Sequence, residues 1–252
     1  MALQLAAVNA ARGARWVGRG FALFGRKPLA LTLLFVVFAA ASTLVAALLP
    51  FVGGLLQLMA LPLLSLGYLI AARSAEGGGP VHPGHFIAPL KAEAPRRRAQ
   101  LALCASYGAL ALLILLLCGV VSDDAMTRLQ LAIAEGDAGH GKVDAILAEP
   151  GLAWAALLFA GLGSLLSIPY WFAPALVHWG GQGVAQALFS STLAILRNKG
   201  AFAVFMLVWF AVVAAASVGI GVLMGLLGGG RAAGLVLMPL ALVCTAVFYV
   251  SQ

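Results

Sequence analysis

The sequence predicts an all-α integral membrane protein that crosses the bilayer several times, and the distribution of its charges is the main reason. Only 9% of the 252 residues are charged and 63% are hydrophobic, whereas soluble domains carry about 25% charged residues. Several long stretches contain no Lys, Arg, Asp, Glu or His: 28–72, 99–122, 150–177, 200–230 and 232–252. About 20 apolar residues cross the hydrocarbon core as a helix, because lipid offers no hydrogen bonds to an extended backbone. One transmembrane domain over 1–252 is therefore predicted, with six spans at 28–49, 55–72, 99–121, 152–177, 201–227 and 232–252.

Residues 1–27 are predicted to contain a basic amphipathic helix that lies in the cytoplasmic headgroup layer. At 100° per residue, one narrow stripe of the helix carries four arginines: Arg12, Arg15, Arg19 and Arg26. Val17, Phe21 and Phe24 fall on the opposite side. A basic stripe facing an apolar one is typical of interfacial helices. The alternative is a disordered basic tail, which the angular clustering of the arginines disfavours.

The basic residues between the spans predict the orientation of the chain. Twelve Lys and Arg residues fall on the side of the N-terminus, and three fall on the other side. The side rich in Lys and Arg is normally cytoplasmic. The loop 123–149 contains six of the eight carboxylates, so we expect an acidic external loop, with a short helix beginning after Asp124. Both termini are therefore expected in the cytoplasm.

The sequence also predicts internal repeats. Residues 21–28, which enter the first span, match residues 193–200, which enter the fifth, with an Ala and a Lys at equivalent positions. Residues 85–98 provide a looser third copy before the third span. We therefore expect units of one interfacial helix followed by two spans, arranged in parallel. The alternative is chance similarity between apolar segments.

Two further segments carry a family resemblance. Residues 173–181 (APALVHWGG) and 187–200 (ALFSSTLAILRNKG) resemble an uncharacterised family of proteobacterial, mainly β-proteobacterial, six-helix inner-membrane proteins with no assigned activity. The plan of a lead-in helix plus spans is more distantly similar to the multi-pass membrane region of some glycerophosphodiester phosphodiesterases. The resemblance implies a fold and a location but no catalytic residue. Because members of the first family continue past their last span with a short polar tail, it also implies residues beyond Gln252.

The sequence predicts no catalytic residue, no cofactor and no metal. The spans contain no Lys, Arg, Asp or Glu, and His178 lies at the cytoplasmic end of the fourth. Charged side chains inside spans mark ion and proton paths, so their absence disfavours an ion-coupled transporter. His82, His85 and His178 are weak candidates for a zinc or copper site. The first two lie in a Gly- and Pro-rich loop without a neighbouring carboxylate, and a solvated loop is the simpler interpretation.

The remaining candidate residues predict contacts rather than chemistry. Together with the N-terminal arginines, the run Arg96, Arg97 and Arg98 is expected to contact anionic lipid headgroups on the cytoplasmic side, and no nucleic-acid partner is expected. The fifth span has small residues every four positions: Ser217, Gly221 and Gly225. Such a stripe lets another helix approach closely, either within the chain, in a homo-oligomer or in a membrane complex.

These features favour a non-enzymatic inner-membrane protein that organises lipid or a membrane protein complex, with no more specific role indicated. The alternative is a transporter or lipid-handling protein whose neutral or apolar cargo binds between the repeats. That alternative requires a cavity lined by polar atoms at mid-depth, such as those of Ser65, Tyr68, Tyr107 or Tyr170. A sealed bundle would favour the first function. An intramembrane enzyme is the least favoured, because no nucleophile–base pair is apparent.

Overall fold

The computed structural model of the protein describes residues 7–49, 52–134, 142–226, 243–249 and 251, and this part of the chain is helical without a strand. Five long helices dominate: α2 (Pro28–Leu48), α3 (Gly53–Glu76), α5 (Ala94–Val121), α8 (Pro150–Tyr170) and α11 (Lys199–Leu226). The shorter helices are α1 (Arg12–Arg26), α4 (Gly84–Ile87), the 3₁₀ turn η1 (Ala88–Lys91), α6 (Ala125–Ala134), α7 (Lys142–Leu147), α9 (Ala173–Gly180) and α10 (Val184–Arg197). Residues 243–249 are also helical. The all-α fold is confirmed.

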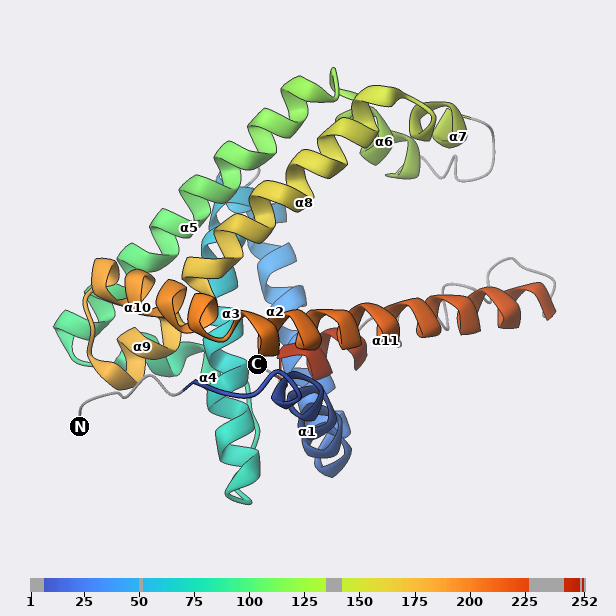
Figure 1. The fold of residues 1–252 in the computed structure, drawn as a ribbon. Helices are drawn as coiled ribbons and strands as arrows, with labels where there is room; N and C mark the ends of the chain where they lie inside the picture. The colour runs from blue at the N-terminus through green and yellow to red at the C-terminus, as the bar shows by residue number, and fades with distance from the viewer. Residues whose placement is uncertain (1–6, 50–51, 135–141, 227–242, 250, 252) are drawn as a thin grey trace.

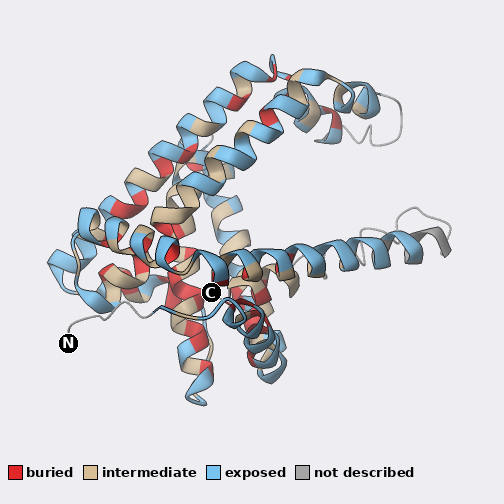
Figure 2. Ribbon diagram, viewed as in Figure 1, coloured by how far each residue is buried: buried red, intermediate tan, exposed pale blue. Residues whose placement is uncertain are grey.

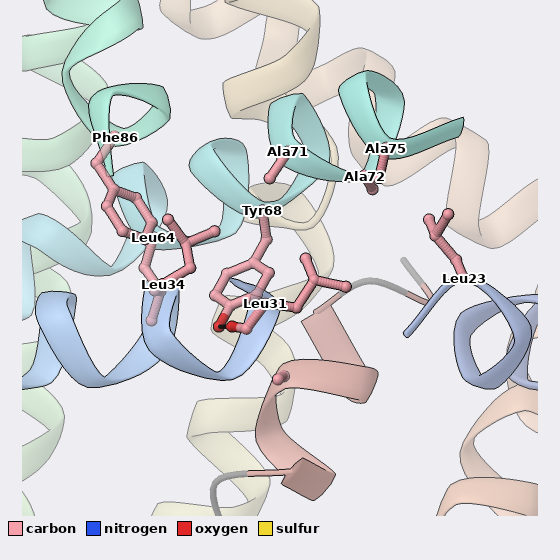
Figure 3. Close-up of a cluster of buried hydrophobic side chains, with 10 residues drawn as sticks. Leu23, Leu31, Leu34, Leu64, Tyr68, Ala71, Ala72, Ala75 and Phe86 are labelled. Atoms are coloured by element: carbon pink, nitrogen blue, oxygen red, sulfur yellow. Dashed lines mark hydrogen bonds between the residues drawn. The ribbon is translucent and has the colours of Figure 1, made fainter. Parts of the chain in front are cut away.

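Helices α2 and α3 form a hairpin that is held by apolar packing and by one buried hydrogen bond. Pro28 begins α2 at a position where its missing N–H costs nothing. Leu31 and Leu34 of α2 pack against Leu64 and Tyr68 of α3, and the hydroxyl of Tyr68 donates to the carbonyl oxygen of Leu31 at 3.0 Å (Figure 3). In lipid-exposed helices, packing and interhelical hydrogen bonds of this kind replace the hydrophobic effect as the source of association.

Helices α5 and α8 form a second antiparallel pair, connected by α6 and α7. The thiol of Cys118 in α5 lies 3.5 Å from the carbonyl oxygen of Ala155 in α8. In the connection, Arg128 donates to both carboxylate oxygens of Glu149 at 2.9 and 2.8 Å. Figure 1 shows α6 and α7 at one end of this pair, and α9 and α10 at the other end. The short helix predicted after Asp124 is present as α6.

The fourth predicted span, 152–177, differs from the prediction because the structure divides it into α8 and α9. Pro174 has no N–H for the carbonyl oxygen of Tyr170, so the helical ladder is interrupted there. The hydroxyl of Ser191 in α10 occupies the break, where it accepts from the Phe172 N–H at 3.0 Å and donates to the Ile168 carbonyl oxygen at 3.1 Å. A serine on a neighbouring helix therefore satisfies backbone groups that the break leaves open.

Helix α1 lies across α11 and is held there by close backbone contact. Gly13, Val17 and Gly20 form its buried side. A Cβ atom added to Gly13 would collide with the Ala201 carbonyl oxygen and lie 2.7 Å from the Phe205 nitrogen. The described residues therefore show α1 packed on the protein by one face, which leaves its other face open.

Five helices among the described residues are long and apolar enough to cross a membrane. They correspond to the first five predicted spans, with boundaries that differ by a few residues. Most of the sixth, 232–252, lies outside the described residues, so six spans remain a prediction. A short helix precedes each long pair or span in the order of elements: α1 before α2–α3, α4 and η1 before α5–α8, and α10 before α11. This order fits the repeat plan, and the repeats themselves remain a prediction. Figure 2 shows that buried residues concentrate along α3, while much of α11 is exposed.

Candidate ligand chamber

Three adjoining cavities, each open at the protein surface, lie among α3, α5, α8, α11 and the helix at 243–249, and together they form what we call the chamber. Their volumes are about 580, 240 and 820 Å³. Met206 of α11 lines all three cavities, which shows that they adjoin. Ligand-binding cavities in proteins usually measure about 300–1,000 Å³. The chamber is therefore large enough to hold part of a lipid.

The two larger cavities of the chamber have mainly apolar walls. The 580 Å³ cavity lies between α8 and the start of α11, where Phe159, Ile168 and Phe202 contribute side chains. The 820 Å³ cavity continues along α11 to Phe210 and Val213. Both are lined by Ser164 and Met206. All the described residues that line the two cavities are uncharged, so the walls suit an apolar chain.

The 240 Å³ cavity is the polar end of the chamber. Its lining includes five hydroxyl-bearing residues from α3, α5, α8 and the helix at 243–249: Ser65, Tyr107, Ser167, Tyr170 and Tyr249. Three of the four side chains that were predicted to mark a neutral-cargo cavity are therefore in it. Tyr68 is not, because its side chain is fully buried between α2 and α3. The other three line this cavity together, as the neutral-cargo alternative requires.

Three of these five residues, Ser65, Ser167 and Tyr170, already have partners within the protein. Tyr170 donates to the Ser106 hydroxyl at 2.8 Å, and Ser167 donates to the Gly163 carbonyl oxygen at 2.8 Å. The hydroxyls of Tyr107 and Tyr249 make no hydrogen bond to any residue in the described part of the chain. Two phenol groups in the polar cavity are thus available to a ligand.

Ring contacts fix the positions of these two tyrosines. The Tyr107 ring meets the Tyr170 ring edge to face, with the centroids 5.1 Å apart. The Tyr249 ring stacks on Tyr68 with a centroid distance of 5.3 Å. Tyr68 is itself held by its bond to Leu31. The polar cavity is therefore formed by side chains whose rings are held before a ligand arrives.

The three candidate metal ligands do not form one site. The ring centroids of His82 and His85 lie 4.2 Å apart in a stacked arrangement, but each ring also has a polar contact with the backbone of the loop that carries both residues. His82 Nδ1 accepts from the Gly84 N–H at 3.1 Å, and His85 Nε2 lies 3.2 Å from the Pro80 carbonyl oxygen. His178 instead packs edge to face on Trp179. Within the described ranges, no three His, Cys, Asp or Glu side chains are placed to share a metal ion.

The predicted headgroup contacts occupy open surfaces. The arginine face of α1 (Arg12, Arg15, Arg19 and Arg26) is exposed, opposite the buried side that contacts α11. Arg96, Arg97 and Arg98 are also exposed and lie near the start of α5. Beside them, the guanidinium group of Arg73 lies 5.4 Å from the centre of the Trp179 ring. These positions are compatible with contact to headgroups.

The predicted packing stripe lies on the outer half of α11. Ser217 and Gly221 are exposed, and a Cβ atom at Gly221 would meet nothing within 4 Å. The surroundings of Gly225 lie outside what the structure describes. The close helix contacts that are observed involve other glycines, including Gly13 against α11 and Gly108 against Met59. The sequence signal for Gly13 was its seven-residue spacing from Gly20 on the apolar side of α1.

Comparison with known proteins identifies a relative. A Burkholderia thailandensis protein described as a probable inner membrane protein is 34% identical over 249 residues, which cover 99% of this chain and 91% of the relative. No protein-family model matches the chain. No solved structure matches it either. The match agrees with the resemblance to proteobacterial inner-membrane proteins that the sequence suggested.

Proposed function

Because this chain belongs to the family of the Burkholderia probable inner membrane protein, we propose that it is a non-enzymatic inner-membrane protein that binds and organises lipid. The chamber is the observation that carries this proposal. A sealed bundle would have favoured a purely structural scaffold, whereas cavities of about 580 and 820 Å³ with uncharged walls can accept a lipid chain. The proposal joins the lipid-organising function with the neutral-cargo alternative.

The position of the chamber supports a chain that enters from the bilayer. Its larger cavities are lined mainly by α8 and α11, and both helices also carry exposed apolar side chains, including Leu157 and Phe210. These exposed faces are expected to contact acyl chains, because apolar helix surfaces of membrane proteins face lipid. A chain between α8 and α11 would thus remain continuous with the surrounding bilayer.

The arginines support a second, cytoplasmic contact with lipid. Arg96, Arg97 and Arg98 occupy the first turns of α5, where the positive end of the helix dipole disfavours cations. Anionic headgroups would compensate for that repulsion, at about 1 kcal/mol for each basic residue near the surface. The arginine face of α1 would act in the same way. This assignment requires both termini to be cytoplasmic, as the distribution of basic residues predicts.

The experiment that tests the proposal fills the chamber and counts bound lipid. Ser164 and Ala203 line the 580 Å³ cavity from α8 and α11, so Ser164→Trp and Ala203→Trp should occupy the space of a chain. Ala156→Trp is the matched control, because Ala156 is exposed on α8 and does not line the chamber. After delipidation and incubation with a radiolabelled lipid, the two filling variants should retain less lipid than the control. Equal retention by all three would refute the chamber as a lipid site.

A second candidate function, the organisation of a membrane complex, rests on the exposed stripe of α11. Ser217 and Gly221 face no described part of the chain, so they are free to contact another helix, in a second copy or in a partner. Gly221→Leu should weaken such an association in detergent, measured by light scattering. If the wild type is an oligomer and Gly221→Leu has the same mass, the contact is refuted.

A further inference from the structure

We infer that the lipid bound in the chamber has an uncharged head that presents carbonyl oxygens, and that Tyr107 and Tyr249 bind that head. The inference rests on the proposed lipid-binding function and adds the chemical class of the ligand. A quinone ring and the ester head of a diacylglycerol are two sources of this chemistry. The experiment below distinguishes them.

The two phenols provide donors for which the described part of the chain shows no bonded acceptor. Both hydroxyls belong to the lining of the 240 Å³ cavity, and neither donates to a residue in the described ranges. A polar group without a partner in an apolar medium is unfavourable, so a bound acceptor would stabilise this arrangement. A carbonyl oxygen accepts the phenolic O–H directly. The geometry therefore favours a ligand with acceptors at its buried end.

The position of Tyr107 along α5 places this head well inside the bilayer. Tyr107 follows Arg98, the last charged residue of the helix, by nine positions, which corresponds to about 14 Å at 1.5 Å per residue. The hydrocarbon core is about 30 Å thick. A head bound by Tyr107 thus lies near the middle of the core, far from the headgroup layer where phospholipid phosphates reside.

The composition of the chamber argues against a charged head. The described residues lining its three cavities include no Lys, Arg or His that could pair with a phosphate or a carboxylate. An isolated ion in a medium of low polarity is strongly disfavoured. The aromatic rings of Trp171 and Phe248, which also line the polar cavity, provide apolar surface for a flat or compact neutral head. The chemistry is thus that of a neutral lipid.

The test uses short-chain probes that separate two properties of the head: its charge and its carbonyl groups. Decylubiquinone and dioctanoylglycerol are neutral and carry carbonyl oxygens, dioctanoylphosphatidate adds a charged phosphate, and 1,2-di-O-octylglycerol replaces the ester carbonyls by ethers. Each probe competes with a chain-labelled photoreactive lipid for labelling of the purified full-length protein. At least one of the two neutral carbonyl lipids should compete at least tenfold better than both the phosphatidate and the ether. The better competitor of the two shows whether the head is a quinone ring or a diacylglycerol ester.

Tyrosine variants then assign the head contact. A hydrogen bond contributes about 1 kcal/mol, so Tyr107→Phe and Tyr249→Phe should each weaken competition by the carbonyl lipid roughly fivefold and the double variant roughly 25-fold. The ether should be unaffected. Ser42→Ala is the control, because it also loses a hydroxyl that is hydrogen-bonded within its helix but lies outside the polar cavity and does not contact either tyrosine.

The outcomes separate the inference from the function on which it rests. If the chamber is labelled but the phosphatidate competes as well as the carbonyl lipids, or the two tyrosine variants behave like Ser42→Ala, the inference is wrong and the lipid-binding function stands. If the chamber is not labelled at all, both are wrong.

Discussion

The contact of α1 with α11 makes a sharp prediction, because one helix offers both a test position and its control. Gly13 faces α11, where an added Cβ would collide with the Ala201 carbonyl oxygen and approach the Phe205 nitrogen to 2.7 Å. Both atoms belong to the backbone, so no side-chain rotation can relieve the contact. Gly18, on the exposed side of α1, has nothing within 4 Å of the same added atom. Gly13→Ala and Gly18→Ala therefore make the same chemical change in two environments.

The expected difference follows from two opposing terms. Alanine in place of glycine within a helix is favoured by about 1 kcal/mol, and Gly18→Ala should gain up to that amount. Gly13→Ala receives the same gain but must push the two backbones apart, and overpacking of this kind costs about 1–3 kcal/mol. The free energy of unfolding of Gly13→Ala should thus be lower than that of Gly18→Ala by about 1–3 kcal/mol. The midpoint of thermal unfolding in detergent shows which of the two variants is less stable. Limited proteolysis near α1 shows whether α1 has been released from α11. A Gly13→Ala variant that is as stable as Gly18→Ala would refute the docking of α1 on α11.

Three other predictions concern the cytoplasmic side. A reporter fused after Gly79 should report a cytoplasmic location, and a reporter fused after Gly139 should report a periplasmic one. A periplasmic signal from the Gly79 fusion would overturn the predicted orientation. Replacing the first three arginines of the arginine face with Glu should weaken binding to vesicles that contain anionic lipid, whereas Lys replacements should preserve it; equal binding by both would show that the charge is incidental. Burial lowers the pKa of His85 below its usual 6.5, so protonation opposes folding and stability should decline as pH falls below about 6.5. His85→Gln should show a weaker decline in melting temperature between pH 7.5 and 5.5, and the same decline would argue that His85 does not contribute.

The membrane architecture was predictable because it depends on properties that act over whole segments. An uncharged stretch of about 20 residues has few alternatives to a spanning helix, which is why the five long apolar helices lie within a few residues of the first five predicted spans. The arginine face was predictable for the same reason, since its four members share a helical stripe. Local departures were harder to foresee. Pro174 interrupts the helix between α8 and α9, but Ser191, which satisfies the open backbone groups at the break, lies in another helix and becomes a neighbour only through the fold.

The chamber was partly predictable. Ser65, Tyr107 and Tyr170 stood out as hydroxyls within spans, and all three line the polar cavity. Tyr68 carried the same signal but instead joins α2 to α3 through its bond to Leu31. Sequence position alone cannot separate a hydroxyl that meets a neighbouring backbone from one that faces a cavity. Tyr249 was missed, because the last span offered no pattern that directs its ring toward Tyr68.

The most direct test of lipid binding in the chamber is to map the positions that a photoreactive lipid chain labels. The labelled lipid is titrated into the delipidated protein, and modified residues are identified by mass spectrometry. Ser164 and Met206, which line the chamber, should be labelled at low lipid concentration, reach saturation and lose the label when unlabelled lipid competes. Leu116 and Leu157 are exposed on α5 and α8 away from the chamber, and their labelling should increase in proportion to lipid without saturation. Uniform, unsaturable labelling at all four positions would contradict a lipid site between α8 and α11.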